Sequence, residues 1–512
     1  MFSVEVCPLP TTGGATGVAV AAVFLLVLGV IVARWTRGSA GRVSFVAVVP
    51  LLLLGIASVS MRPSSSTCNA SPTTTAPPVT APPTTLAPLI LEIDTSLLPP
   101  VQVDSVTSLD AGFVYELGLF GDVDVHVDWG DGLSDEVTVA GPFAHTYTTS
   151  GQYTITVSGT LTGLGQGSCC DVLLGAQYLT AVHSFGNLGI ESLMRAFLGA
   201  NNLTEVPSTL PATVTNMRSM FSGASAFNQN LAGWDTSSVT DMSGMFEYAS
   251  VFNQSLDSWD TSGVTDMSYM FSSPSSFNQS LSSWDTSSVK YMSYMFYGAS
   301  SFNESLAGWD TSSVTNMRLM FYGASSFNQN LAGWDTSNVT NMTMMFSDAS
   351  AFNQSLSSWN TSSVTDMSFM FSSASAFNQS LSSWNTSSVT DMSGMFYVAS
   401  SFAGDISGWV TSNVTNMDHM FYFAESFNSD LGGWDISNVT DMSDMLHESG
   451  LSSANYAATL IGWASRSVKP NVPLGANGLA VSSYGSAGCD ARQLLRDSPT
   501  SWDISDSSDC NP

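Results

Sequence analysis

The dominant pattern in the chain is a 25-residue spacing of large apolar side chains. Phe recurs at this interval from 227 to 427, and Trp recurs from 234 to 434, without drift. A fixed period of this length is typical of a solenoid, in which each unit buries its apolar face only against its neighbours. We therefore predict a repeat solenoid over residues 213–450.

Within one unit, the apolar positions predict a short helix and a short strand. The helix-like positions recur on one face: Val239, Met242, Met245, Phe246 and Ala249. Residues 256–261 are bounded by polar turn residues, which predicts a strand. Each unit would then contain one strand and one short helix, as in leucine-rich repeats.

The segment before the repeats has a different pattern, with short alternating apolar and polar runs over residues 89–165. This pattern predicts the strands of an all-β domain. The turn Trp129-Gly130-Asp131-Gly132 and the later His145-Thr146-Tyr147 strand resemble the PKD-like β-sandwich of surface proteins. We assign Asp128 and Asp131 to the shaping of that turn, because Asp and Gly form such turns without a metal. The alternative is that the two aspartates form a calcium pair.

Two apolar runs, residues 17–33 and 43–60, open the chain and are separated by a segment with three arginines. Runs of this length are at the short end of what spans a bilayer, and a positive loop marks the cytoplasmic side. We predict a transmembrane hairpin over 17–60 with both ends outside, and the alternative is a long signal peptide cleaved near residue 60. Both interpretations export the rest of the chain. Residues 61–88 are rich in Pro and Thr and predict an extended linker.

A sorting-like motif lies in the N-terminal tail, residues 1–16. It consists of Leu9, Pro10, Thr11, Thr12 and Gly13. Followed by an apolar run and Arg, it resembles the signal that sortases cut in the wall proteins of Gram-positive bacteria. That family carries the signal at the C-terminus, so the resemblance points to this type of envelope without explaining how the chain is anchored. The alternative is a chance occurrence of a short motif.

Charge and composition exclude several classes of function. The 512 residues contain 12 Lys+Arg against 41 Asp+Glu, for a formal net charge of −29. Nucleic-acid binding needs clustered basic side chains, so we expect no nucleic-acid partner. The sequence contains no metalloprotease, P-loop or serine-hydrolase motif. We therefore predict neither enzyme activity nor a cofactor.

The repeat consensus, with Trp-Asp-Thr-Ser, Val-Thr-Asp/Asn-Met, Met-Phe and Phe-Asn-Gln, resembles a bacterial surface-protein repeat family. That family is of the BspA-like leucine-rich-repeat type and is found in surface lipoproteins. The resemblance implies surface display and an adhesive role without catalytic residues. We expect a membrane-anchored cell-surface protein that binds an extracellular protein or glycan through the solenoid face. The alternative is a structural spacer or surface-layer component without a specific ligand.

Several recurring or paired side chains are candidates for a site. The Trp column is either an aromatic strip for sugar or, as we predict, core. The Asn column that begins at Asn228 predicts an internal amide ladder rather than a ligand site. One column of carboxylates either closes Asx-turns, as we predict, or forms a calcium-binding edge. It contains Asp235, Asp260, Asp285, Asp310 and Asp335.

The segments beside the repeats complete the predicted organisation. Residues 166–212 are predicted as leading coils that cover one end, and residues 451–512 as a C-terminal cap. Cys489 and Cys510 flank the last part of that cap and are a candidate disulfide, which an exported segment permits.

Overall fold

The computed structural model describes residues 87–97, 112–166, 172–481 and 486–510, all of which belong to one structural unit. The predicted hairpin at 17–60, the sorting-like motif and the linker up to residue 86 lie outside these ranges. Within them, no helix is both long and apolar enough to span a bilayer. The predicted hairpin is therefore no part of the fold that the structure describes. The predicted fold class also needs correction for the β-sandwich and for the helix and strand of each repeat unit, as shown below.

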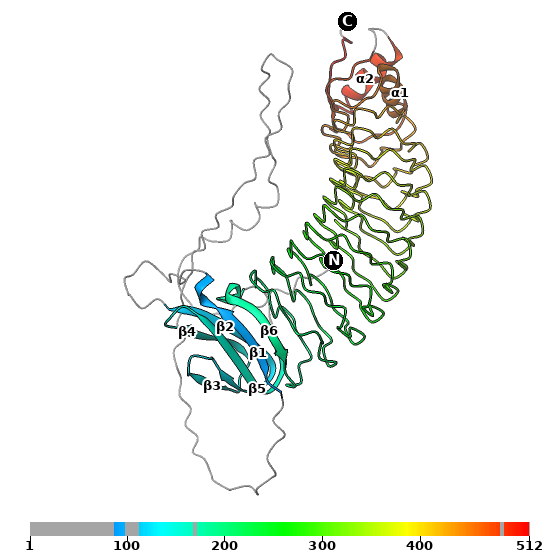
Figure 1. The fold of residues 1–512 in the computed structure, drawn as a ribbon. Helices are drawn as coiled ribbons and strands as arrows, with labels where there is room; N and C mark the ends of the chain where they lie inside the picture. The colour runs from blue at the N-terminus through cyan, green and yellow to red at the C-terminus, as the bar shows by residue number, and fades with distance from the viewer. Residues whose placement is uncertain (1–86, 98–111, 167–171, 482–485, 511–512) are drawn as a thin grey trace, which may run out of the picture. The chain divides into compact units, whose positions relative to one another are not determined.

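The described chain begins with a six-stranded antiparallel sheet, in the strand order β3-β2-β5-β1-β6 with β4 paired to β2 (Figure 1). Inward and outward residues alternate along its strands, as in β1, where Leu89, Leu91 and Ile93 are buried. The elements are β1 (Leu89–Asp94), η1 (Thr95–Leu97), β2 (Phe113–Asp128), β3 (Ser134–Val137), β4 (Gly141–Tyr147), β5 (Gln152–Leu164), η2 (Ala176–Tyr178) and β6 (Leu179–Phe185).

The prediction of a two-sheet sandwich is wrong, because all six strands belong to one sheet. The long strand β2 joins its two halves. The first part of β2 pairs with β4, with Phe113 opposite Tyr147, and the second part pairs with β5 and β3, with Val127 opposite Val157. The register shifts between Phe120 and Val123, where Gly121 has a φ of 76°. A bulge of this kind lets one strand change direction without leaving the sheet.

The hairpin between β2 and β3 confirms the turn interpretation of the two aspartates. The Asp128 Oδ1 accepts the Gly130 N–H at 2.9 Å, and the Asp131 Oδ1 accepts the Leu133 N–H at 3.0 Å. The other oxygen of Asp131 lies 2.8 Å from Nε2 of His145, whose ring stacks on Trp129 at 4.7 Å. These side chains are all engaged in holding the turn.

Beyond the sheet, the chain forms stacked coils joined by a column of one-residue parallel bridges, here called the bridge column. The column starts on Gly163 of β5 and ends where Met442 bridges to Leu474. Its members are Ser192, Asn216, Asp241, Asp266, Tyr291, Asn316, Asn341, Asp366, Asp391, Asn416 and Asp441.

The predicted helix and strand of each unit are both wrong. Over the described residues 186–452, neither a helix nor a multi-residue strand forms. Gly244 and Tyr248 have φ values of 63° and 57°, and this left-handed conformation interrupts an α-helix. The Phe246 N–H donates instead to the Met270 carbonyl of the next coil at 3.0 Å. The Ala249 N–H turns back to the Phe246 carbonyl at 3.1 Å, so the three- and four-residue spacings belong to successive tight turns.

An apolar ladder fills the interior of the coils, and an amide ladder runs along their surface. The Trp side chains are at most 5% exposed, which confirms that this column is core. The Trp259 indole N–H donates to the Leu231 carbonyl of the preceding coil at 3.2 Å. The predicted amide ladder forms, because the Asn253 N–H donates to the Asn228 Oδ1 at 2.9 Å. Its placement inside the coils was wrong, because Asn228 is exposed and Asn253 is half-buried. Each coil therefore depends on its neighbour for both burial and hydrogen bonds.

The far end of the stack is closed by the C-terminal segment. Its elements are α1 (Ser453–Ala464), β7 (Pro473–Ala476), α2 (Ala487–Arg496) and β8 (Asp503–Asp506), with β7 and β8 parallel. The Leu446 N–H of the last coil donates to the Gly475 carbonyl of β7 at 2.8 Å. In α1, the Trp463 indole N–H donates to the Leu431 carbonyl at 3.0 Å, which continues the bonding of the Trp column.

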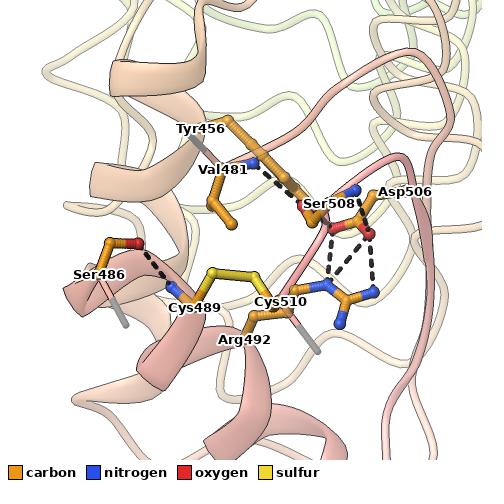
Figure 2. Close-up of a disulfide and its surroundings, with 8 residues drawn as sticks. All are labelled: Tyr456, Val481, Ser486, Cys489, Arg492, Asp506, Ser508 and Cys510. Carbon is orange, nitrogen blue, oxygen red and sulfur yellow. Dashed lines mark hydrogen bonds and ion pairs between the residues drawn. A yellow bond between two sulfur atoms is a disulfide. The ribbon is translucent and has the colours of Figure 1, made fainter. Parts of the chain in front are cut away.

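A buried cluster holds this cap together (Figure 2). A disulfide joins Cys489 of α2 to Cys510. Beside it, the Arg492 guanidinium lies 2.7 Å from the Asp506 Oδ1, and the Tyr456 hydroxyl donates to the Asp506 Oδ2 at 2.7 Å. Burial raises the pKa of Asp506, but the hydrogen bonds from Arg492 and Tyr456 outweigh it, so the pKa lies below its ordinary value. Asp506 is therefore a buried carboxylate that stays charged.

We expect acid and the Asp506→Asn substitution to loosen the cap in the same way. A lowered pKa in the folded state contributes stability above the ordinary pKa, and that stability is lost as the pH falls through the folded-state pKa. At about pH 6, the substitution leaves Arg492 without its anion and should cost about 3 kcal/mol. Urea unfolding at about pH 6 and about pH 3 should show this difference shrinking in acid. The control is Asp503→Asn, on an exposed residue of β8; equal effects of the two substitutions would contradict the prediction.

We expect Ser373→Gly to stabilise the coils. Ser373 has a φ of 56°, and the same position is occupied by Gly298 and Gly323 in other coils. Removing the side chain relieves left-handed strain, and the gain after the extra chain entropy of glycine should be about 0.5–1 kcal/mol. The matched control is Ser375→Gly, where φ is not positive and the substitution should destabilise. Urea midpoints of the two variants that move in the same direction would disprove the interpretation.

Candidate functional site

One surface of the coils carries side chains that change from coil to coil, while the flanking Met and Phe residues stay constant. We call it the aromatic face, and it comprises the third, sixth and seventh residues after each bridge-column residue from Asp241 to Asp441. The third positions are Gly244, Tyr269, Tyr294, Leu319, Met344, Phe369, Gly394, His419 and Asp444. The sixth positions are Glu247, Ser272, Tyr297, Tyr322, Ser347, Ser372, Tyr397, Tyr422 and His447. The seventh positions are Tyr248, Ser273, Gly298, Gly323, Asp348, Ser373, Val398, Phe423 and Glu448.

Many of these side chains stand on left-handed backbone. Tyr269 and Tyr294 have a φ of 60°, and His419 a φ of 55°. This conformation costs a non-glycine residue about 1–2 kcal/mol, and glycine occupies the equivalent position at Gly244 and Gly394. The fold therefore accommodates glycine where the chain instead places aromatic rings. Residues kept in strained backbone are typical of functional surfaces.

The middle of the face carries a tyrosine ladder, formed by Tyr269, Tyr294, Tyr297 and Tyr322. The rings of Tyr269 and Tyr294 are 4.4 Å apart at 10°, and those of Tyr297 and Tyr322 are 4.8 Å apart at 7°. The Arg318 guanidinium lies 6.0 Å from the centre of the Tyr294 ring. Burial, reinforced by neighbouring Tyr294, raises the pKa of Tyr269 to about 12. The Tyr269 hydroxyl therefore remains a neutral donor at physiological pH.

A second set of rings, the histidine–tyrosine ladder, lies towards the C-terminal end of the same face. It is formed by Tyr397, His419, Tyr422, Phe423 and His447. The Tyr422 ring is stacked between Tyr397 at 5.0 Å and His447 at 4.7 Å. Phe423 lies beside this stack, with its ring centre 4.8 Å from that of Tyr422 and at 63° to it. These rings are half-buried, so their edges remain accessible.

Carboxylates surround this second ladder. The Asp418 Oδ1 lies 2.5 Å from Nδ1 of His419, and Asp444 lies 3.7 Å from both His419 and His447. Burial raises the pKa of Asp418 above its ordinary value, although the neighbouring histidine opposes this shift. The exposed Glu448 adds a further negative charge beside His447. The C-terminal end of the face therefore combines rings with negative charge.

The column of aspartates named from the sequence closes Asx-turns, as predicted. In each case the Oδ1 accepts the N–H of the Ser two residues later: at Asp235 the distance is 3.1 Å, and at Asp260 it is 3.0 Å. Hydrogen bonds from the Ser side chain and then from its backbone lower the pKa of each aspartate in the column; the other members are Asp285, Asp310 and Asp335. No group of three potential metal-ligating side chains occurs in the part of the chain that the structure describes.

Sequence reasoning missed the aromatic face. Its residues fall in the positions of the repeat that vary, and a consensus discards them. The available signal was the appearance of Tyr at these variable positions in neighbouring units, as at Tyr269, Tyr294 and Tyr297. The predicted strand face at 256–261 instead forms a turn, in which the Trp259 N–H donates to the Leu256 carbonyl at 3.1 Å. The sorting-like residues Leu9 to Gly13 lie outside the described residues.

The repeats match a known family model. The model, described as a Mycoplasma protein of unknown function, DUF285, matches residues 191–308, 271–375, 301–403 and 352–463. Together these overlapping matches span more than half of the chain, and they coincide with the coils. They contain neither the antiparallel sheet nor the N-terminal motif, so they test neither the PKD-like nor the sorting-like resemblance. No curated protein matches the chain.

We expect Asp335 to distinguish the turn interpretation from a calcium edge. Asn360 accepts the Ser362 N–H at 3.1 Å in the equivalent turn, so Asp335→Asn should retain the bond and leave stability within about 0.5 kcal/mol. Asp335→Ala removes the acceptor and should cost about 1 kcal/mol. Urea unfolding with and without calcium measures both variants. A calcium-dependent stabilisation that Asp335→Asn abolishes would favour the metal edge instead.

Proposed function

The chain belongs to the DUF285 family of repeat proteins of unknown function, and on this premise we propose that it is a cell-surface adhesion protein that binds an extracellular protein through its aromatic face. The proposal concerns binding and assigns no catalytic residue. Surface display is supported by the low charged fraction of 10%, with Ser, Thr and Asn at most polar positions. The sorting-like resemblance of residues 9–13, which lie outside the described residues, agrees with this location.

The observation that carries the proposal is the concentration of variable aromatic side chains on one surface. The backbone bridges of the bridge column, the Trp column and the Asn ladder recur in nearly every coil, and they account for the stability of the stack. The tyrosine ladder is half-exposed and adds strained backbone at Tyr269 and Tyr294. Clustered Tyr side chains supply large, rigid contact area at low entropic cost, which is a recurring property of protein-binding surfaces.

Ring geometry favours a protein partner over a glycan. A sugar stacks on an open ring face, but the faces of Tyr269 and Tyr294 cover one another at 4.4 Å. The same is true of Tyr297 and Tyr322 at 4.8 Å. The ladder therefore presents ring edges and hydroxyls, which suit contacts with side chains and backbone amides. Glycan binding remains an outcome that the experiment below separates.

The alternative of a spacer without a ligand rests on the near-identity of the remaining columns. An inert spacer needs only the bonds along the stack and the core ladders. It does not account for rings at left-handed positions where other coils have glycine, as at Gly244 and Gly394. The aromatic face therefore favours the binding function.

The test compares full-length chain with a variant in which Tyr269, Tyr294, Tyr297 and Tyr322 are replaced by Ser. Beads coated with each protein are incubated with a panel of extracellular-matrix proteins and mucin-type glycans, and bound ligand is quantified. We expect the wild type to bind a protein of the panel, and the variant to lose at least about tenfold in affinity, because it lacks the anchoring rings. The thermal midpoint of each protein establishes that both are folded.

The matched control replaces Asp235, Asp260, Asp285 and Asp310 by Asn. It also carries four substitutions, but they lie on another part of the coils. It should leave binding within about twofold, since exposed polar positions outside an interface contribute little. Equal losses in both variants would exclude the aromatic face as the binding surface. If the wild type binds only glycans of the panel, the partner is a glycan and the proposal of a protein partner is wrong. Self-association of the wild type in light scattering, without binding to the panel, would favour the spacer.

A further inference from the structure

We propose that the histidine–tyrosine ladder at the C-terminal end of the aromatic face docks a basic, arginine-bearing segment of a partner protein. This inference rests on the proposed function and names the class of partner for one part of the same surface. It is carried by the distribution of charge over the ladder and by the geometry of its rings.

Charge separates the two ladders of the face. The tyrosine ladder has charges of both signs beside it: Arg318 lies over Tyr294, and the carboxylates of Glu247 and Asp348 act on Tyr269 and Tyr322. In the described residues 391–450, by contrast, the chain contains neither Lys nor Arg. That segment holds Asp418, Asp444 and Glu448 beside the rings. A surface with one sign of charge selects and steers a partner of the opposite sign.

The carboxylates of this ladder are only partly balanced by their neighbours. Asp418 and Asp444 contact His419, and Asp444 also contacts His447. Asp441 and Asp444 add further negative potential at Asp418, and burial also raises its pKa. On the cap side, the facing contact is the Asn477 amide, 3.1 Å from Nδ1 of His447, which carries no charge. A bound cation would offset the repulsion among these carboxylates.

The rings make the surface specific for guanidinium groups. The faces of Tyr422 are covered by Tyr397 and His447. Phe423 instead meets Tyr422 at 63° and His447 at 53°, so neither ring is stacked on its face. Val398 on the same face is 36% exposed. A guanidinium is planar and weakly hydrated, so it stacks on aromatic rings while its N–H groups reach carboxylates. An ammonium forms the same ion pair without comparable stacking. The combination of half-exposed rings and carboxylates therefore fits Arg better than Lys.

The experiment measures binding of fluorescent peptides to the full-length chain by anisotropy. Three peptides of equal length are used, with Ser alternating with Arg, Lys or Glu. We expect the Arg peptide to bind several-fold more tightly than the Lys peptide, and both to weaken between about 50 and about 200 mM salt. The Glu peptide should not bind. Absence of measurable binding by the Arg peptide would overturn the proposal.

Two sets of variants locate the site. Asp444→Asn combined with Glu448→Gln should weaken the Arg peptide about tenfold, because two charge-assisted contacts are lost. Asp285→Asn combined with Asp310→Asn changes the net charge equally in the exposed Asp column, and it should change affinity by no more than about twofold. Equal effects of the two pairs would mean that binding follows net charge alone, and would overturn the assignment.

A ring variant tests the stacking. Phe423→Leu retains an apolar side chain but removes the ring whose face is not covered by a stacked neighbour, and it should reduce the preference for Arg over Lys while leaving Lys binding within about twofold. An unchanged preference would overturn the role of the ring, and the thermal midpoint reports whether the variant is folded. If the four-tyrosine variant abolishes protein binding but the Arg peptide fails to bind the wild type, this inference falls and the proposed function stands.

Discussion

Backbone hydrogen bonds between neighbouring coils are the constraint on which the rest of this structure depends. Left-handed residues such as Gly244 and Tyr248 prevent a continuous helix, so alternate N–H groups turn towards the next coil, as from Phe246 to Met270. No unit can satisfy its own backbone, and the two ends of the stack need special partners. At one end β5 provides the first bridge, and at the other the carbonyls of β7 replace those of a further coil. The cap, with its charged Asp506 and its disulfide, follows from this requirement.

The same constraint separates scaffold from surface. The bonds along the stack use backbone atoms and a few invariant side chains, such as the Trp259 indole and the Asn228 amide. Most side chains at the third, sixth and seventh positions of each coil take no part in such bonds; Glu247, which accepts the Ser222 hydroxyl at 3.5 Å, is an exception. They are free to vary between coils without disturbing the core. Because equivalent positions of successive coils lie side by side, neighbouring aromatic residues stack into ladders, and binding chemistry is built across coils rather than within one.

Much of the stack was predictable, because a strict period makes each residue type line up with itself. The Trp core, the Asn ladder and the Asx-turns all followed from single columns. The local conformation was not predictable in the same way. Apolar residues three or four apart, such as Val239, Met242 and Phe246, indicate a helix when only side-chain spacing is considered. Successive tight turns produce the same spacing, and only the positive φ values distinguish them. The single sheet likewise depends on β2 passing through both halves.

The sequence by itself determined the period, the apolar core, the negative charge and the membership of the coils in a repeat family. These properties depend on residue type and spacing, which are local and need no knowledge of the backbone path. Only the tertiary structure decided which variable residues meet, for instance Tyr397 with Tyr422 and His447, and how the ends of the stack are closed. The physical reason is that the path within a coil is set by hydrogen bonds to the next coil. Those partners lie about one repeat away, beyond the reach of any rule based on local spacing.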